Sequence, residues 1–233
     1  MFYDNGGNGD GKVETITGSH ILVAAGRRPT VHGLGLDEAG ICYSDMGIGV
    51  DARLRTSNKK IFAIGDVAGG LQFTHVAGYH AGVVIKNALF RWPAKVDTGS
   101  VPWVTFTAPE LAQVGLTEAQ AKDAHGDIRV LRWPYHENDR AQAEKETDGM
   151  IKAVVTAKGK ILGCGIAGAH AGELIQTWVL AKSKNLKIGD MAQMITPYPT
   201  FGEVSKRAAG SFYTASLFSE RTRKIVRFLS RFG

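Results

Sequence analysis

The stretch Ile61-Phe-Ala-Ile-Gly-Asp66-Val-Ala-Gly-Gly70 constrains the fold of this chain more strongly than any other segment. The apolar residues Ile61 to Ile64 predict a short strand, and Gly65 predicts a tight turn that leaves Asp66 at the strand's carboxyl end. The Ala- and Gly-rich run from Val76 to Leu89 predicts a helix after the turn. Ligands of open α/β sheets bind at the carboxyl ends of strands, where a carboxylate accepts hydrogen bonds from ribose or ribityl hydroxyls. Asp66 is therefore a candidate ligand-binding residue, with helix capping as the alternative.

Composition and charge exclude several classes of protein. The chain has 233 residues, of which 44% are hydrophobic, and this is enough for a real core. No apolar run approaches the ~18 residues that a membrane span needs. Residues 1–11 are polar and glycine-rich, unlike a signal peptide. Because residues 1–11 do not resemble a signal peptide, we expect a cytoplasmic location. Much of the net charge of +6 lies in the last thirty residues, so we expect no nucleic-acid partner.

The two cysteines, Cys42 and Cys164, are too far apart in the sequence for a CxxC or CxxxxC redox pair. Cys164 stands between glycines after an apolar run and is expected to be a small buried thiol, with a long-range disulfide as the open alternative. The histidines lack the spacing of metal ligands, so no metal site is expected.

The first part of the chain is predicted to be a small mixed segment. Strands are expected at Val13–Ile16, His20–Ala24 and Ile48–Val50, and a helix at Thr74–Phe90. The polar segment Arg91–Ser100 carries Pro93 and is expected to be a linker between domains.

The second part predicts an α+β layer, in which an antiparallel sheet has helices on one face. Its alternating or apolar runs are typical of strands, and Gly159-Lys160 predicts the tight turn between the last two. The expected strands are Val101–Phe106, Pro109–Val114, Ile128–Pro134, Met150–Thr156 and Lys160–Gly165, and the expected helices are Thr117–Ala124, His170–Lys182, Ile188–Ile195 and one from Val204.

Several of these segments resemble those of one known family. The run His20 to Thr30 is similar to a strand-ending ATG-R-x-P element, with Ala25 where Thr is usual, and the run Leu54 to Asp66 is similar to a T-x-x-x-I-F-A-I-G-D flavin motif. From about Gly18 to about Gly210 the chain resembles the FAD-dependent pyridine nucleotide–disulfide oxidoreductases, which include dihydrolipoamide dehydrogenase, glutathione reductase and mercuric reductase. The downstream segments that resemble the family's interface domain are Pro102 to Glu118, Ile161 to Glu173 and Pro199 to Glu203.

The resemblance implies a domain plan and a cofactor. Residues 1–95 would be the closing part of an FAD domain, 101–212 a dimerisation domain, and 213–233 a basic amphipathic tail. The family's opening GxGxxG motif, its CxxxxC pair and its NAD(P)H domain are missing from the sequence, so we expect the C-terminal part of a flavoprotein about twice as long. Such a part is expected to bind FAD weakly or not at all and to be inactive alone. The implied FAD-binding residues are Ala25, Gly26, Gly65, Asp66, Phe73, Thr74, His75 and Ala77, and the last four begin a helix that points at the flavin.

Tyr198 and Glu203 are the candidate catalytic residues. In disulfide reductases of the resembled family, His occupies the Tyr198 position, and Glu five residues on orients that base. A phenol with a pKa near ~10 is a poor base at neutral pH, so the usual disulfide chemistry is not expected. Tyr here resembles mercuric reductase, although the C-terminal cysteine pair of that enzyme is missing from this sequence. The alternative is an interface aromatic residue bonded to Glu203.

The resemblance also implies a symmetric homodimer, and the expected contributors are Trp103, Phe106, Trp178, Ile195, Tyr198 and Phe201. The function predicted for the intact protein is NAD(P)H oxidation through FAD with a dithiol, disulfide or metal-ion acceptor. A catalytically inert dimerisation module is the alternative. A third hypothesis is an independent nucleotide site at Gly163–Gly168, which fits GxGxxG but follows an expected hairpin. The basic tail, Leu217 to Phe232, is expected to pack on the enzyme, with peripheral membrane contact as the alternative.

Overall fold

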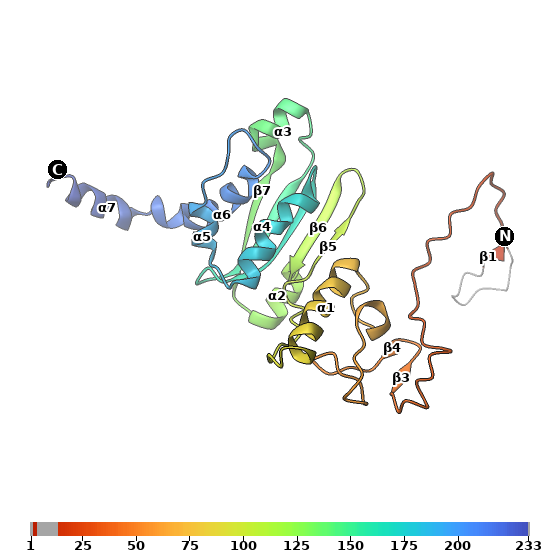
Figure 1. Ribbon diagram of the computed structural model, residues 1–233. Coiled ribbons are helices and arrows are strands. Elements are labelled where there is room, and N and C mark those ends of the chain that lie inside the picture. The colour runs from red at the N-terminus through yellow and green to blue at the C-terminus, as the bar shows by residue number, and fades with distance from the viewer. Residues whose placement is uncertain (1, 4–13, 233) are drawn as a thin grey trace. The chain divides into compact units, whose positions relative to one another are not determined.

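The computed structural model describes residues 2–3 and 14–232, and it divides the chain into two compact units with the boundary between Val96 and Asp97 (Figure 1). Two short strands near the start, β1 (Phe2–Tyr3) and β2 (Glu14–Thr15), pair antiparallel. The strand expected at Val13–Ile16 is therefore seen only at Glu14–Thr15, and Val13 lies outside the described residues.

The first unit is built around one helix and a small apolar core. The hairpin of β3 (Tyr43–Ser44) and β4 (Gly47–Ile48) precedes the 3-10 helix η1 (Gly65–Ala68) and the helix α1 (Thr74–Ala88). The predicted helix at Thr74–Phe90 is thus confirmed to within two residues. The buried side chains of the core are Val31, Leu36, Ile41, Ile48 and Ala63.

Two strands predicted in this unit are wrong. His20–Ala24 has no regular structure, and Leu22 within it is 90% exposed. Ile61–Ile64 forms only an isolated bridge, in which Phe62 faces Arg55. An apolar run meets the side-chain condition for a strand, but its backbone groups also need a neighbouring strand. Within the part of the chain that the structure describes, neither run has one beyond that bridge.

The second unit contains a five-stranded antiparallel sheet in the order β5-β6-β9-β8-β7. This confirms the predicted α+β fold, and each predicted strand is present within three residues of its expected bounds. The strands are β5 (Pro102–Thr105), β6 (Glu110–Gly115), β7 (Ile128–Pro134), β8 (Met150–Thr156) and β9 (Ile161–Gly168).

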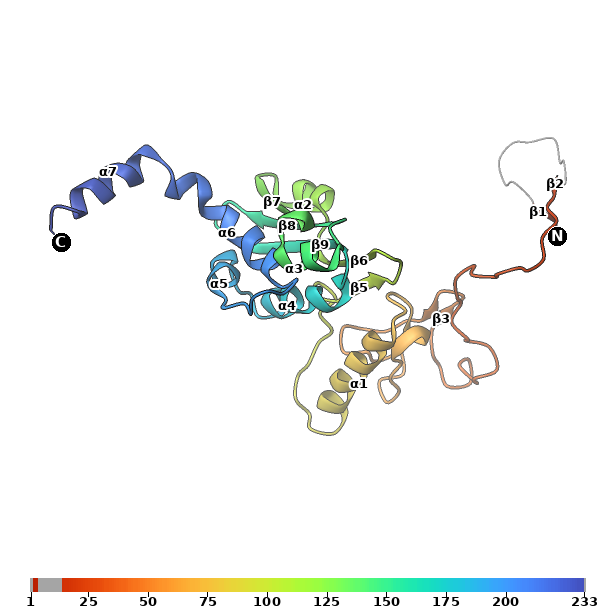
Figure 2. The same ribbon diagram turned by 90° about the horizontal axis from the view of Figure 1, so that it is seen from above.

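Helices cover the sheet unequally. The helices α4 (Ala171–Ser183), α5 (Ile188–Gln193) and α6 (Glu203–Leu217) lie over one face and bury its main core (Figure 2). The shorter α2 (Glu118–His125) packs on the other face, where Ala121 meets Val154 and Leu162. Two short elements were not predicted, the 3-10 helix η2 (Tyr135–Glu137) and α3 (Asp139–Glu144). The last helix is α7 (Glu220–Leu229).

Buried polar contacts fix the helices of the main core. The fully buried Trp178 of α4 donates from Nε1 to Ser205 Oγ of α6 at 3.0 Å, so the indole N–H is satisfied inside an apolar core. On the neighbouring strand β7, Arg129 donates to the Phe212 carbonyl at 2.8 Å and lies 4.0 Å from the centre of the Phe212 ring. These contacts set the position of α6, which begins at Glu203.

Close packing against the sheet explains why glycines occur in the GxGxxG-like segment. Gly163 to Gly168 lies inside β9, which pairs antiparallel with both β6 and β8, whereas a dinucleotide fingerprint needs a βαβ connection. A Cβ at Gly163 would collide with the Leu116 carbonyl, and a Cβ at Gly168 would stand 2.6 Å from the Tyr135 ring. The glycines therefore let backbone and ring approach β9 closely.

No helix in the described part of the chain is long and apolar enough to cross a membrane.

Replacement of Gly163 by alanine should destabilise the second unit. The added methyl group meets backbone that cannot rotate away, so we expect a loss of about 1–3 kcal/mol in the free energy of unfolding. The matched control is Gly210→Ala in α6, where a Cβ meets nothing within 4 Å and helix propensity should add about 0.5–1 kcal/mol. Urea midpoints followed by tryptophan fluorescence measure both changes, and equal midpoints would contradict this account of β9.

Candidate functional site

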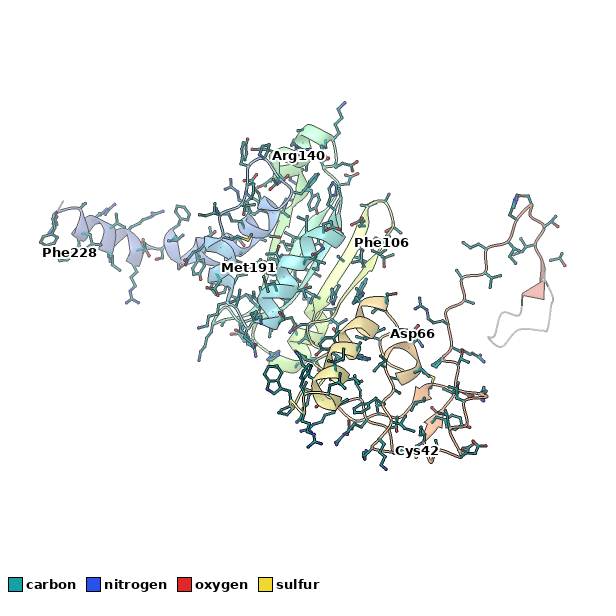
Figure 3. The ribbon with its side chains drawn as sticks, viewed as in Figure 1. Cys42, Asp66, Phe106, Arg140, Met191 and Phe228 are labelled. Atoms are coloured by element: carbon teal, nitrogen blue, oxygen red, sulfur yellow. The ribbon has the colours of Figure 1, made fainter. Side chains whose placement is uncertain are left out.

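The turn that carries Asp66 is held by an arginine from the preceding segment. Arg27 Nη1 lies 3.3 Å from Asp66 Oδ2 and donates to the Gln72 carbonyl at 2.8 Å. Asp66 stands in η1 directly after Gly65, which has a φ of 67°. The guanidinium thus joins the turn to the segment that leads into α1, and the half-exposed carboxylate keeps acceptor capacity for hydroxyl groups. Figure 3 shows the Asp66 side chain on this turn.

A buried histidine of α1 supports the same turn. The Gly65 N–H donates to His80 Nδ1 at 3.2 Å, so Nδ1 carries no proton. Burial lowers the pKa of His80 below its ordinary value, which keeps the ring neutral. The unfolded chain therefore takes up a proton first. The stability from neutral His80 is present above about pH 6.5 and is lost as pH falls toward the lower folded pKa.

Sequence reasoning did not find His80 as a residue that positions the turn. The available signal was its place on the buried face of α1, where Val76, His80 and Val83 follow one another at helical spacing. That spacing marks a buried side chain, but only the fold shows that its ring nitrogen accepts from Gly65.

Gly69 after η1 and Gly47 in β4 allow close backbone packing. A Cβ at Gly47 would stand 2.7 Å from the Gly69 nitrogen, and a Cβ at Gly69 would stand 2.7 Å from the Met46 carbonyl. The β3–β4 hairpin is therefore packed directly on the turn. This contact leaves little freedom for the backbone that carries Asp66.

The other predicted FAD residues lie around this turn or at the start of α1. Phe73 is the N-cap, and its ring stacks on His75 with centroids 5.1 Å apart. No side chain caps this helix end, so the positive end of the helix is available to an electron-rich group. Ala77 would lie 3.0 Å from a Cβ at Gly65. The remaining residues are Thr74, which begins α1, and Ala25 and Gly26, which directly precede Arg27.

The surroundings of Tyr198, in the second unit, differ from the prediction. Its hydroxyl donates to Asp139 Oδ2 at 2.9 Å, so the alternative in which Tyr198 bonds Glu203 is wrong. This hydrogen bond and the charge of Asp139 raise the pKa of the Tyr198 phenol, and the charge of Glu203 raises it further. The exposed phenol is therefore a hydrogen-bond donor at neutral pH and an even poorer base than an ordinary tyrosine.

The loop that presents Tyr198 is anchored on both sides. The buried Asn138 donates to the Thr200 carbonyl at 3.0 Å, and its side-chain oxygen caps α3 by accepting from Ala141 at 2.9 Å. Phe201 inserts its ring between Tyr135 and His170, with centroid distances of 5.8 and 5.0 Å. The sequence alone did not indicate Asn138 or Asp139 as partners of this loop. The Asn-Asp pair was a helix-start signal, but nothing in the sequence joined it to residues sixty positions away.

Glu203 begins α6 and lines a cavity of about 420 Å³. Two basic residues of the same helix, Lys206 and Arg207, border it, together with Trp133, whose Nε1 is buried without a hydrogen-bond partner among the described residues. Tyr198 and Glu203 thus interact through charge and not through a direct hydrogen bond. The other lining residues are Ala192, Gly210, Ser211 and Thr214.

The two cysteines are free thiols in different surroundings. Cys164 is fully buried, and burial raises the pKa of its thiol, as expected of a structural cysteine. Cys42 is exposed and free. Within residues 2–3 and 14–232, no three His, Cys, Asp or Glu side chains gather as a metal site would require.

Two family models match the sequence. The pyridine nucleotide-disulphide oxidoreductase model matches residues 5–81, and the dimerisation-domain model of the same family matches residues 101–209. The Asp66 turn and the start of α1 fall within the first match, and Tyr198 and Glu203 fall within the second.

Curated enzymes of two kinds, dihydrolipoyl dehydrogenases and mercuric reductases, are similar to the chain. It is 38% identical to a dihydrolipoyl dehydrogenase of Bacillus subtilis (strain 168) over 201 residues, which are 85% of the chain and 43% of the relative. It is 40% identical to a mercuric reductase of Staphylococcus aureus over 205 residues, which are 87% of the chain and 38% of the relative. The chain thus spans about two fifths of the length of these relatives.

Solved structures resemble it in fold. LpdA from Mycobacterium tuberculosis matches with a TM-score of 0.80 and 28% identity over 85% of the chain and 44% of that structure. The Cu(II) complex of the HOCl-induced flavoprotein disulfide reductase RclA from Escherichia coli matches with a TM-score of 0.77 and 29% identity, over 85% of the chain and 47% of that structure.

Removal of the Asp139 charge should return the pKa of Tyr198 toward its ordinary value. Asp139→Asn removes the largest cause of the raised pKa, so the phenol should ionise at lower pH. Tyrosinate absorbance against pH measures this, with Tyr198→Phe subtracted to isolate the residue. Glu137→Gln is the matched control, because Glu137 is an exposed carboxylate without a contact to Tyr198. An unchanged titration in Asp139→Asn would contradict the assigned hydrogen bond.

Proposed function

Because the chain belongs to the pyridine nucleotide-disulphide oxidoreductase family, we propose that it supplies part of an FAD site and the dimer interface of an NAD(P)H-dependent flavoprotein reductase. The observation that carries the proposal is the cluster of Arg27, Asp66 and the uncapped start of α1. A carboxylate acceptor and a positive helix end side by side fit a ligand with both hydroxyl groups and an electron-rich ring.

The residues around Asp66 fit one portion of FAD. Asp66 would accept from ribityl hydroxyls, and the backbone at Thr74, His75 and Ala77 would face the flavin with the positive end of α1. Gly26 would allow close approach, since its φ is 89° and a Cβ there meets nothing within 4 Å. When bound, FAD supplies the hydride-accepting and electron-donating chemistry between NAD(P)H and the acceptor. The protein would hold Asp66 in place through Arg27, His80 and the β3–β4 hairpin.

The proposed electron acceptor is a disulfide or a metal ion, and a dithiol would be the electron donor to FAD when the reaction runs in the reverse direction. The donor character of Tyr198 favours an acceptor from which this residue takes no proton, and a metal ion meets that condition. Glu203 would act through its charge on Tyr198 and on the cavity of α6. The similarity to both dihydrolipoyl dehydrogenase and mercuric reductase leaves both acceptor classes in the proposal.

The second unit is proposed to form a homodimer. Apolar side chains remain exposed on it, including Phe106 at 81% and Ile195 at 94%. Figure 3 shows Phe106 between β5 and β6. Trp103 and Tyr198 are also exposed, and such a set of large side chains is typical of an interface. Two predicted contributors, Trp178 and Phe201, are wrong, because both are buried in the protein's own core.

An inert dimerisation module is the second candidate. It is favoured by the exposed segment that contains Leu22, where the resembled family has the strand that ends in its ATG-R-x-P element. Flavin binding separates the two candidates, since an inert module would show no saturable binding of FAD.

The isolated chain should bind FAD weakly and in a manner that depends on Asp66. Asp66→Asn removes a charged acceptor, so the dissociation constant should rise about tenfold, while the exposed carboxylate variant Glu38→Gln should bind unchanged. Quenching of flavin fluorescence in an FAD titration measures both. Near-stoichiometric FAD retained through gel filtration would contradict a partial site, and equal affinity in Asp66→Asn would contradict the role of Asp66.

Charged substitutions on the exposed apolar surface should weaken the dimer. Phe106→Asp and Ile195→Asp should each weaken self-association by about 30-fold or more, since loss of an apolar anchor costs about 2 kcal/mol. Ile85→Asp is the control, because Ile85 is exposed on α1 outside the dimerisation model. Light scattering at tens of micromolar protein gives the mass, and a monomeric wild-type chain would count against the dimer.

A further inference from the structure

The helix α7 stands apart from what the family fold requires. It spans Glu220–Leu229 and lies beyond both matched segments, which end at residues 81 and 209. Ser219 caps it by accepting from the Thr222 N–H at 3.2 Å, so the helix has its own start signal. None of its described residues is buried. A helix that has its own N-cap but buries none of its described residues indicates a surface that binds something outside this fold.

One face of this helix is apolar. Five large side chains gather on it, and each is about half exposed or more. Phe232 lies three residues beyond the end of the helix, and its ring is 5.2 Å from that of Phe228. Figure 3 shows Phe228 on α7. The residues of this apolar face are Ile225, Val226, Phe228, Leu229 and Phe232.

The opposite face is basic. At helical spacing, Arg223, Lys224 and Arg227 fall on the arc away from the apolar face, Arg231 follows the end of the helix, and all are exposed. Arg221 in the first turn falls on the apolar side. Glu220 is the single acidic residue of the tail, and it occupies the first turn, where a negative charge suits the helix dipole. A short helix therefore joins an unpartnered apolar face to a concentrated positive charge.

We propose that α7 is a peripheral anchor that lies on the surface of an anionic bilayer. The apolar face would enter the boundary between headgroups and acyl chains, and the basic residues would remain beside lipid phosphates. Ten residues extend about 15 Å, against the ~30 Å of a bilayer core, so the helix cannot span it.

Two other occupants fit the helix less well. In a symmetric dimer, the apolar faces of two copies would meet and bring the same basic side chains near one another without acidic partners. A nucleic acid would pair with the basic face but leave the apolar face in water. An anionic bilayer satisfies both faces at once, and this complementarity selects it.

The test uses the full chain and sedimentation with vesicles. Vesicles of equal parts phosphatidylcholine and phosphatidylglycerol should bind the protein at low salt, while vesicles of phosphatidylcholine alone should bind it weakly. Binding to the anionic vesicles should fall steeply in about 1 M salt, where exposed charges are screened beyond about 3 Å. Equal binding to both kinds of vesicle, or none to either, would overturn the proposal.

Paired variants separate the two faces. Arg223→Ser with Arg227→Ser should weaken binding to anionic vesicles about 30-fold, or about fivefold for each basic residue removed. Phe228→Ser with Phe232→Ser should weaken it at least as much, because the apolar face no longer enters the bilayer. The matched control, Lys158→Ser with Lys184→Ser, removes the same charge from exposed positions outside the tail and should change binding less than twofold. If the control variant binds anionic vesicles as weakly as the α7 variants do, the proposal is overturned.

Light scattering of the chain shortened by residues 217–233 tests the competing occupant. The shortened chain should lose vesicle binding and keep the oligomeric state of the full chain. A drop from dimer to monomer, or aggregation, would show that α7 packs on a second copy and would overturn the anchor. The result is independent of FAD, because flavin binding and vesicle binding are separate measurements.

Discussion

The close approach of β9 to its neighbours is the constraint on which the second unit depends. This strand pairs with both β6 and β8, and nearly all of its residues are buried. Gly163 admits the backbone at Leu116, and Gly168 admits the ring of Tyr135, whose hydroxyl then donates to the Ala169 carbonyl at 3.0 Å. Through Tyr135 and His170 the strand also supports Phe201, and thereby the loop that presents Tyr198. Packing at the centre of the sheet thus determines where a surface phenol stands.

The first unit is held together differently. Its apolar core is small, and specific polar contacts fix the turn at Asp66: the ion pair with Arg27, the hydrogen bond from Gly65 to His80, and the backbone contact between Gly47 and Gly69. A neutral buried ring is one of these supports, so acid weakens the turn. The surroundings of the residue proposed to meet FAD are therefore sensitive to pH.

The chemistry of Tyr198 follows from its neighbours. The Tyr198 hydroxyl donates a hydrogen bond to Asp139, and Glu203 adds negative charge nearby. Both carboxylates raise the pKa of the phenol, so it stays protonated at neutral pH and cannot act as a base. A histidine at the same place would be able to take up a proton near neutral pH, whereas this phenol does not. The tail adds a separate property, since α7 presents apolar and basic faces that no part of the described fold covers.

The sequence by itself determined the family, the α+β class and the strands of the second unit, because alternating apolar residues and turn glycines are local signals. It also determined that Asp66 lies at a turn before a helix. It misassigned His20–Ala24 and Ile61–Ile64, because strand formation depends on a neighbouring backbone that an apolar run cannot specify. Only the tertiary structure decided that Asp139 and not Glu203 bonds Tyr198, that His80 supports Gly65, and that Trp178 lies in the core. Each of these contacts joins residues from separate elements, and sequence patterns carry no information on which of many polar groups will meet across the fold.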